Sequence, residues 1–388
     1  MGLKSMIPLI CLCLIGATQA ELFYGLPNEQ QPAEEFYNGF QEPAPIIDVD
    51  EAQLPEQIEQ AEQPEQESVE SPKIPLNIGH ATGVAVNKDG QLVVFHRAGR
   101  VWDEFSFNEK TNVFNKSLDA LHNATITVLD PTSGQILGEF GQGLFYMPHG
   151  MSIDASGNYW VTDVGRHQVF KLNSEFKPLL VLGEKMVPGS DEHHFCKPTD
   201  VAVSSKTGEI FVADGYCNSR IMKFSADGKF LGSFGNMNTD QEKPANGEFF
   251  VPHSIALIED LNLLCVADRE NQRIQCFTAG LSPKGAHQRA ITPTGSFVTK
   301  AQNIGRIMAI REKQHYLVGV TNTEPNTSND YELFIMDMNS GKANTFAKGI
   351  PDAHAVALSK DGSIYVAQLD PSQVLKFSVP QTDDQSMQ

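Results

Sequence analysis

Apolar and polar positions in this chain follow a repeating pattern from about residue 76 to residue 379, and successive repeats open 48 to 67 residues apart. Each repeat opens with a short apolar run, and a small polar turn such as Asp154–Asn158 follows it. The six opening runs are Ala81–Val86, Pro148–Ile153, Pro198–Val203, Pro252–Leu257, Gly305–Ile310 and Ala353–Leu358. Short apolar runs bounded by turn residues predict β-strands.

Further candidate strands follow in each repeat. A second run ends in a Val-x-Asp-like step, as in Val161–Asp163, and a third comes after another polar turn, as in Arg220–Phe224. In the third repeat, Phe230–Phe234 supplies a fourth. Four short strands in each of six units predict an all-β fold, a six-bladed β-propeller.

The second position of each opening run differs between repeats. It reads Thr82, His149, Thr199, His253, Arg306 and His354, so histidine occupies every second repeat. The innermost strands of a propeller line its central channel, and three histidines a third of a turn apart can therefore meet at the axis. Three neutral imidazoles beside an open position form a catalytic zinc site. The alternative is that each histidine only satisfies a local hydrogen bond.

Three other side chains depart from ordinary turn chemistry. Arg97 and Arg269 each follow the Val-x-Asp position of their repeat, and a guanidinium is suited to binding a carboxylate. Tyr216 is a candidate base if neighbouring cations lower its pKa. The alternatives are surface arginines paired with Glu270 or Asp103, and a tyrosine that only packs beside a cysteine.

The two ends of the chain differ in composition from the repeats. Residues 1–20 combine Lys4, an apolar run too short to span a membrane and small final residues, which predicts a cleaved signal peptide. Residues 21–75 contain 14 acidic side chains against one lysine, and glutamine and proline fill much of the rest. This composition predicts a disordered linker or pro-region, and the alternative is an acidic interaction tail. Residues 380–388 form a polar tail.

The net charge and the absence of a predicted membrane span limit the kinds of partner that the chain is expected to bind. The formal net charge of the chain is −19, which argues against nucleic-acid binding. No later stretch approaches the 18 or so apolar residues of a membrane span. We therefore expect a secreted monomer that meets its substrate in solution.

The cysteines agree with a secretory location. Two of the six fall within the signal peptide, and the four that remain are Cys196, Cys217, Cys265 and Cys276. Four cysteines permit three pairings, of which pairing within each repeat is the simplest. A four-cysteine zinc site is disfavoured because CxxC spacing is absent. Glycosylation sequons begin at three positions, two of them in a long excursion of the first repeat: Asn115, Asn123 and Asn326.

Several long strings carry a family resemblance. They include Phe145–Gly150, His194–Val203, Asp214–Ile221, Val251–Ser254 and Cys265–Asn271. In these strings the chain resembles peptidyl-α-hydroxyglycine α-amidating lyase, an NHL-repeat propeller, in its stand-alone form. The resemblance covers about residues 76–379 and relates the chain to the lyase half of peptidylglycine α-amidating monooxygenase.

The resemblance implies a set of site residues. It places zinc on His149, His253 and His354, the catalytic base at Tyr216, and substrate-binding or electrostatic roles at Arg97 and Arg269. It also implies the disulfides Cys196–Cys217 and Cys265–Cys276. A structural calcium in the family uses carbonyl oxygens at positions matching Val84 and Met151, together with an aspartate whose position is Ala355 here. That replacement leaves the calcium ligand set incomplete, and Asp352 is a possible substitute.

The implied reaction is that of a peptidylamidoglycolate lyase. Such an enzyme cleaves a peptidyl-α-hydroxyglycine to a C-terminally amidated peptide and glyoxylate, with zinc as the Lewis acid and the tyrosine as the base. Arg97 or Arg269 would hold the substrate carboxylate. Three alternatives remain: a non-catalytic NHL propeller that serves as a secreted binding module, an inactive lyase, and a calcium-dependent lactonase. The lactonase is disfavoured because such sites gather acidic and amide side chains at the axis rather than histidines.

Overall fold

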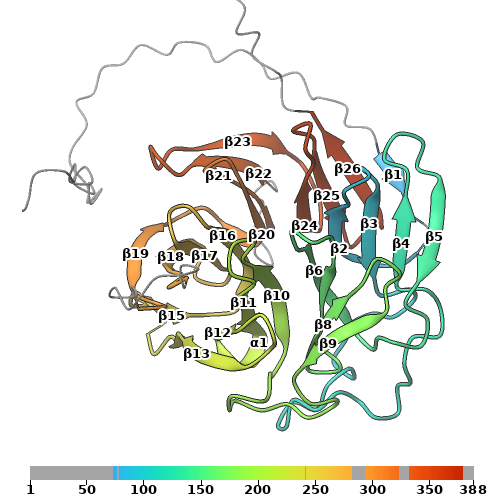
Figure 1. Cartoon of the computed structure of the whole chain (residues 1–388), viewed down its shortest axis with the longest axis horizontal. Helices are drawn as coiled ribbons and strands as arrows, with labels where there is room; N and C mark the ends of the chain where they lie inside the picture. Colours follow the sequence, from blue (N-terminus) through green and yellow to red (C-terminus); the bar gives the residue numbers. More distant parts are fainter. Residues whose placement is uncertain (1–72, 77, 241, 282–292, 323–331, 379–388) are drawn as a thin grey trace, which may run out of the picture. The chain divides into compact units, whose positions relative to one another are not determined.

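The computed structural model describes residues 73–76, 78–240, 242–281, 293–322 and 332–378 (Figure 1). The expected signal peptide, nearly all of the expected linker, the polar tail and Asn326 lie outside these residues. Six four-stranded antiparallel sheets are arranged as the blades of a propeller, which confirms the predicted fold. Within the described residues, no helix has the length and apolar character that crossing a bilayer requires.

The first three blades are each built from consecutive strands, numbered here from the inside outward. Blade 1 comprises β2 (Ala81–Val86), β3 (Leu92–His96), β4 (Ile126–Leu129) and β5 (Ile136–Phe140). Blade 2 comprises β6 (Pro148–Ile153), β7 (Tyr159–Asp163), β8 (Gln168–Leu172) and β9 (Pro178–Leu182). Blade 3 comprises β10 (Pro198–Val203), β11 (Ile210–Asp214), β12 (Arg220–Phe224) and β13 (Phe230–Phe234), with the short helix α1 (Gly215–Asn218) after β11.

The remaining blades follow the same plan until the last one. A short parallel pair, β14 (Asn236–Met237) and β15 (Glu248–Phe249), precedes blade 4. Blade 4 comprises β16 (Pro252–Ile258), β17 (Leu263–Asp268), β18 (Arg273–Thr278) and β19 (Phe297–Ala301). Blade 5 comprises β20 (Arg306–Lys313), β21 (Tyr316–Asn322), β22 (Glu332–Asp337) and β23 (Ala343–Lys348). Blade 6 comprises β24 (Ala353–Leu358), β25 (Ile364–Gln368), β26 (Gln373–Phe377) and β1 (Lys73–Pro75).

The strand β1 closes the ring. It pairs with β26, so that the outer strand of blade 6 comes from the opposite end of the chain (Figure 1). The sequence placed residues 73–75 in the linker. A three-residue strand next to an acidic, proline-rich segment has no alternation to reveal it, because a period of two needs a longer run to be recognised.

The core lies between blades rather than within one blade. Each inner strand packs on the inner strand of the next blade, and β24 of blade 6 packs on β2 of blade 1. Six apolar clusters fill the six interfaces, one for each pair of adjacent blades. The second strands β3, β7, β11 and β25 are buried along their whole length. This packing holds the inner strands, and the side chains at their starts, in fixed positions.

A β-bulge near the start of each inner strand sets the position of the residue at the axis. The ladder between inner and second strand skips one residue in blades 1, 3, 4, 5 and 6, and the irregular stretch in blade 2 includes His149. The skipped residues are Thr82, Thr199, His253, Met308 and His354. Blade 5 therefore places Met308 at this position, and the expected Arg306 is wrong by two residues. A bulge presents its extra residue out of the ladder.

Candidate active site

The three histidines from alternate blades meet at the channel axis. His149, His253 and His354 are 1%, 2% and 5% exposed, and their ring centroids are 4.8 to 5.1 Å apart. One ring nitrogen from each lies within 4.8 Å of the others, close enough for a shared metal ion. The convergence predicted from alternate repeats is confirmed.

Each histidine is oriented by the blade that follows it. The Nδ1 atoms of His149, His253 and His354 lie 2.9, 2.6 and 2.7 Å from the backbone oxygens of Thr199, Met308 and Thr82, respectively. A backbone oxygen can only accept, so each Nδ1 carries the proton and donates it. This tautomer leaves Nε2 of each ring without a proton, which is the arrangement of a metal-ligating histidine.

Burial keeps these imidazoles neutral. It lowers the pKa of His354 to about 3 and lowers the pKa values of His149 and His253 well below the ordinary range, with further lowering from neighbouring histidines and arginines. Neutral imidazole is the form that binds zinc. Three such donors with fixed tautomers fit the zinc site implied by the sequence.

Tyr216 lies on α1 and reaches the histidines from blade 3. Its Oη atom is 2.9 Å from Nε2 of His149 and 3.1 Å from Nε2 of His253. A guanidinium nitrogen of Arg269, Nη1, lies 3.3 Å from the same oxygen and donates to it. The predicted base is thus surrounded by two imidazoles and one cation.

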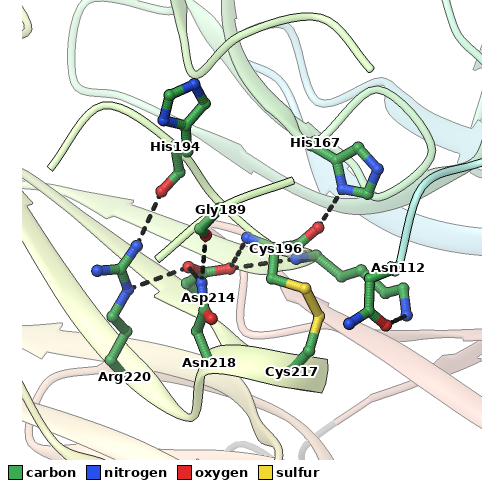
Figure 2. The surroundings of a disulfide bond; sticks show 10 residues. Asn112, His167, Gly189, His194, Cys196, Asp214, Cys217, Asn218 and Arg220 are labelled. Carbon is green, nitrogen blue, oxygen red and sulfur yellow. Dashed lines mark hydrogen bonds and ion pairs between the residues drawn. A yellow bond between two sulfur atoms is a disulfide. The ribbon is translucent and has the colours of Figure 1, made fainter. Parts of the chain in front are cut away.

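A buried carboxylate and a disulfide hold the loop that carries Tyr216. Asp214, at the end of β11, accepts hydrogen bonds from the backbone amides of Cys196 and Lys197 and from the side chains of Asn218 and Arg220 (Figure 2). The bond Cys196–Cys217 links the residue after Tyr216 to the segment preceding β10. The second bond, Cys265–Cys276, joins directly paired residues of β17 and β18. Both disulfides match the expected pairings, and such bonds are typical of the secretory pathway.

The two arginines occupy equivalent positions but differ in their charge partners. Arg97 and Arg269 each follow the last residue of a second strand, β3 and β17. Arg269 contacts the carboxylate of Glu270 at 2.7 Å, and Arg306 shares that carboxylate. Arg97 is 4% exposed and its Nε atom donates to the backbone oxygen of Pro148 at 3.0 Å. Burial lowers the pKa of Arg97 to about 10, which leaves it charged at neutral pH.

An aromatic cluster beside the site was not anticipated. The ring of Trp102 lies 4.9 Å from that of Tyr216 and 6.4 Å from that of His149, and the Arg97 guanidinium lies 5.4 Å from it. Trp102 belongs to the long excursion of blade 1, between β3 and β4, which the sequence marked only as a loop with sequons. A lone tryptophan in a loop gives no spacing signal, so its place could not be read from the chain.

A lysine fastens this excursion to blade 3. The Lys197 ammonium donates to Oδ1 of Asn112 at 2.8 Å and lies 4.5 Å from the ring centre of Phe107. The Phe107 ring in turn lies 5.0 Å from that of Trp102. Burial lowers the pKa of Lys197 to about 8. The contacts place Trp102 beside Tyr216 through a chain of aromatic and cationic groups.

Comparison with known proteins agrees with this geometry. Residues 145–172, 195–224 and 251–277 match the NHL repeat family. A probable peptidyl-alpha-hydroxyglycine alpha-amidating lyase of Caenorhabditis elegans is 48% identical over 373 residues, which cover 96% of this chain and 97% of that protein. The chain belongs to the peptidyl-α-hydroxyglycine α-amidating lyase family.

Other relatives agree with this membership. The peptidyl-alpha-hydroxyglycine alpha-amidating lyase 2 of Drosophila melanogaster is 40% identical over 76% of this chain and 69% of its own length. The peptidyl-glycine alpha-amidating monooxygenase of Mus musculus is 43% identical over 81% of this chain but only 32% of its own length. Among solved structures, a gluconolactonase from Xanthomonas campestris superposes with a TM-score of 0.52 at 11% identity, over 78% of this chain and 88% of that one. The last likeness shows the fold alone.

The positions expected to bind calcium in this lyase family lie on inner strands. Val84 and Met151 are buried on β2 and β6, and Ala355 follows the third histidine on β24. The backbone oxygen of Met151 accepts a hydrogen bond from Nη2 of Arg311 at 3.0 Å. Asp352, the possible substitute ligand, lies in the turn before β24 with a positive φ of 46°.

Two of the three sequon asparagines lie in described residues of this family member. Asn123 is exposed in the excursion of blade 1. The Asn115 amide donates to the backbone oxygen of Phe105 at 3.1 Å, and its own oxygen accepts from the backbone amide of Ser117. Glycosylation at either asparagine stays a prediction.

Proposed function

We propose that this chain is a zinc-dependent lyase that cleaves peptidyl-α-hydroxyglycine to a C-terminally amidated peptide and glyoxylate. The observation that carries the proposal is the position of the Tyr216 hydroxyl, which contacts Nε2 of two candidate metal ligands and Nη1 of Arg269. This arrangement puts a base, a cation and a metal-binding triad around one point. Membership of the lyase family supports the same reaction.

His149, His253 and His354 would hold the zinc ion through Nε2. A bound zinc supplies Lewis-acid polarisation of the substrate hydroxyl oxygen. The three Nδ1–H groups, committed to backbone oxygens, keep the rings from rotating away from the axis. Tight inter-blade packing around the inner strands fixes the distances between the rings.

Tyr216 would act as the base. Its deprotonated oxygen takes the proton of the substrate hydroxyl, the C–N bond breaks, and the hydroxyl oxygen becomes the aldehyde oxygen of glyoxylate. The electrons of the broken bond pass to the amide nitrogen, which takes the proton from Tyr216 and becomes the terminal amide, so the tyrosine oxygen is again deprotonated. The guanidinium of Arg269 favours negative charge on the tyrosine oxygen, to which it already donates. A positioned base of this kind typically contributes about 10²- to 10⁴-fold to the rate.

Arg97 is better suited than Arg269 to bind the substrate carboxylate. Within the described residues, Arg97 forms no ion pair with an acidic side chain, whereas Arg269 is paired with Glu270. A buried guanidinium that lacks an anionic partner is unfavourable, so binding of a carboxylate to it is favoured. We assign the carboxylate of the hydroxyglycine to Arg97, and stabilisation of Tyr216 to Arg269.

The location and partners follow from the same proposal. The two disulfides and the family relationship favour the secretory pathway. Peptides that end in α-hydroxyglycine are the proposed substrates, and we propose that the chain acts as a secreted monomer.

The test is release of glyoxylate from a synthetic peptide that ends in α-hydroxyglycine. Purified protein should produce glyoxylate and amidated peptide in equal amounts, lose this activity in a zinc chelator, and regain it when zinc is returned. Elemental analysis should find about one zinc per chain. A zinc-loaded, folded protein that leaves the peptide intact would favour the non-catalytic binding module.

A further inference from the structure

Arg311 interrupts a set of small residues on the inner strands. Counted from the bulge, the third following position holds alanine or serine in five of the six blades, and an arginine in blade 5. The six residues are Ala85, Ser152, Ala202, Ala256, Arg311 and Ala357. A long cationic side chain among these small residues near the axis requires an explanation.

The guanidinium of Arg311 connects four blades. From β20 it donates through Nη2 to the backbone oxygen of Met151 on β6, at 3.0 Å. Both terminal nitrogens contact Asp200 on β10, Nη1 to Oδ2 at 2.8 Å and Nη2 to Oδ1 at 3.2 Å. Nη1 also donates to Oγ of Ser254 on β16 at 3.1 Å and to the backbone oxygen of Ile310 at 2.8 Å. The contact with Asp200 is a two-point pairing, the geometry to which a guanidinium is suited.

Asp200 is a carboxylate that requires a cation. It is 3% exposed, and its remaining contacts are hydrogen bonds from the Ser254 hydroxyl and from the backbone amides of Ile255 and Val201. The corresponding position in the other blades is Gly83, Gly150, Ser254, Ala309 or Ala355. Arg311 therefore balances the one carboxylate at this level of the inner strands. A buried carboxylate without a counter-charge is strongly unfavourable.

The oxygens that hold this guanidinium are of the types that a calcium ion selects. Carboxylate and backbone carbonyl oxygens are the ligands of Ca²⁺ in proteins, and Met151 is one of the two carbonyl positions expected for calcium. The third expected ligand is a carboxylate directly after the third histidine, and this position is occupied by Ala355. A dication at the Met151 oxygen would lie next to a fixed positive charge and would be repelled. The residues present therefore do not fit a calcium ion at this place.

We propose that Arg311 is the resident cation of the channel and takes the structural place of calcium. The guanidinium supplies the positive charge that Asp200 needs, and it ties β6, β10 and β16 to β20 without a metal. Met151 lies two residues from His149 on β6, so the same contact braces a strand that carries a candidate zinc ligand. This inference concerns ion content and stability, and it is independent of the lyase activity.

The first test measures calcium in the unmodified protein. Protein purified in the presence of calcium and then dialysed should contain less than about 0.1 calcium per chain by elemental analysis, while zinc is counted in the same sample. Addition of millimolar calcium should leave the Tm unchanged. One calcium per chain, or a calcium-dependent rise in Tm of several degrees, would overturn the proposal.

The second test measures the coupling between Arg311 and Asp200. Arg311→Met should lower the Tm by about 5 °C or more, because it leaves a buried carboxylate unpaired. The double variant Arg311→Met, Asp200→Asn should recover part of this loss, since both charges are then removed. Equal and additive losses, or a wild-type Tm for Arg311→Met, would refute the role of Arg311 as counter-charge.

Two further variants guard against simple misfolding. The Lys313 ammonium, on the same strand as Arg311, donates to the backbone oxygens of Ser359 and Lys360. Lys313→Ala removes this cation, and the Tm of the variant should stay close to that of the wild type. Arg311→Lys keeps the charge but loses the two-point contact, and its Tm should fall between those of the wild type and Arg311→Met. A loss in Lys313→Ala as large as that in Arg311→Met would contradict a specific role for Arg311.

Discussion

The Nδ1 atom of His253 lies 2.6 Å from the backbone oxygen of Met308 in the next blade. A backbone carbonyl performs this orienting role, so the contact does not depend on the side chain at position 308, and leucine has a volume close to that of the buried methionine. We expect Met308→Leu to keep its zinc and its activity. His253→Ala, in contrast, should lose at least 10-fold in zinc affinity, because one of three ligands is gone. Zinc titration of both variants checks this, and strong loss of zinc in Met308→Leu would contradict it.

Tyr216→Phe tests the proposed base. The substitution removes only the oxygen that contacts His149, His253 and Arg269. We expect kcat to fall by about 10²-fold or more, with an unchanged zinc content and a nearly unchanged Tm. Turnover close to that of the wild type would eliminate Tyr216 as the base.

Substitution of Arg97 and substitution of Arg269 should change different kinetic parameters. Arg97→Gln removes the proposed carboxylate partner and should raise KM for the hydroxyglycine peptide by about 10-fold or more. Arg269→Gln removes the cation beside the Tyr216 oxygen and should act mainly on kcat. Steady-state kinetics on one peptide distinguish the two, and the assignment of roles is wrong if the pattern is reversed.

Trp102 should form an apolar wall for the residue that precedes the hydroxyglycine. Its ring centre lies 4.9 Å from that of Tyr216 and 5.4 Å from the Arg97 guanidinium. Trp102→Ala should raise KM by about 10-fold for a peptide with an aromatic residue at that position and by less for a glycine peptide. Trp102→Phe should keep most of the preference. Equal losses for the two peptides would show that Trp102 only supports the loop.

Acid should destabilise the fold through buried histidines outside the metal-binding triad. Burial lowers the pKa of His96 to about 4, whereas an unfolded histidine has a pKa of about 6.5. Between these values the unfolded state binds more protons, so stability falls as the pH falls, by about 1.4 kcal/mol per pH unit for each such histidine. His167, with a pKa of about 4, behaves alike.

The matched variant is His96→Gln, compared with the wild type in zinc-loaded protein. Denaturant unfolding between pH 6.5 and pH 4 should show a smaller loss of stability in the variant than in the wild type. The difference should be the contribution of one histidine, about 1.4 kcal/mol per pH unit. Parallel curves for the two proteins would mean that His96 does not remain neutral in the fold.

The sequence showed most clearly the features that repeat. The histidines of alternate repeats could be recognised because a fixed period places equivalent residues at equivalent points of the ring. Blade 5 is misaligned at Arg306 because its opening run has neither the threonine nor the histidine that occupies the bulge position in the other five blades. The register became clear only from the pairing of Ile307 with Thr321 and of Ala309 with Val320.

Contacts between distant residues were beyond the reach of spacing. Trp102 meets Tyr216, and Arg311 meets Met151 across 160 positions of sequence. No periodic pattern connects such pairs, since they arise from the closure of the ring and from a single long loop. The disulfides, by comparison, were accessible because both partners of each pair fall within one repeat.

Lys73 of β1 pairs with Leu375 of β26, so the seam of the ring joins the first and last strands of the domain. During synthesis the earliest strand has no partner until the final blade has left the ribosome. The ring therefore cannot close before the last blade has formed, and until then β1 and the outer edge of blade 6 are unpaired and favour association with other chains. Deleting residues 73–75 should accordingly reduce the yield of folded protein even though every proposed catalytic residue is retained.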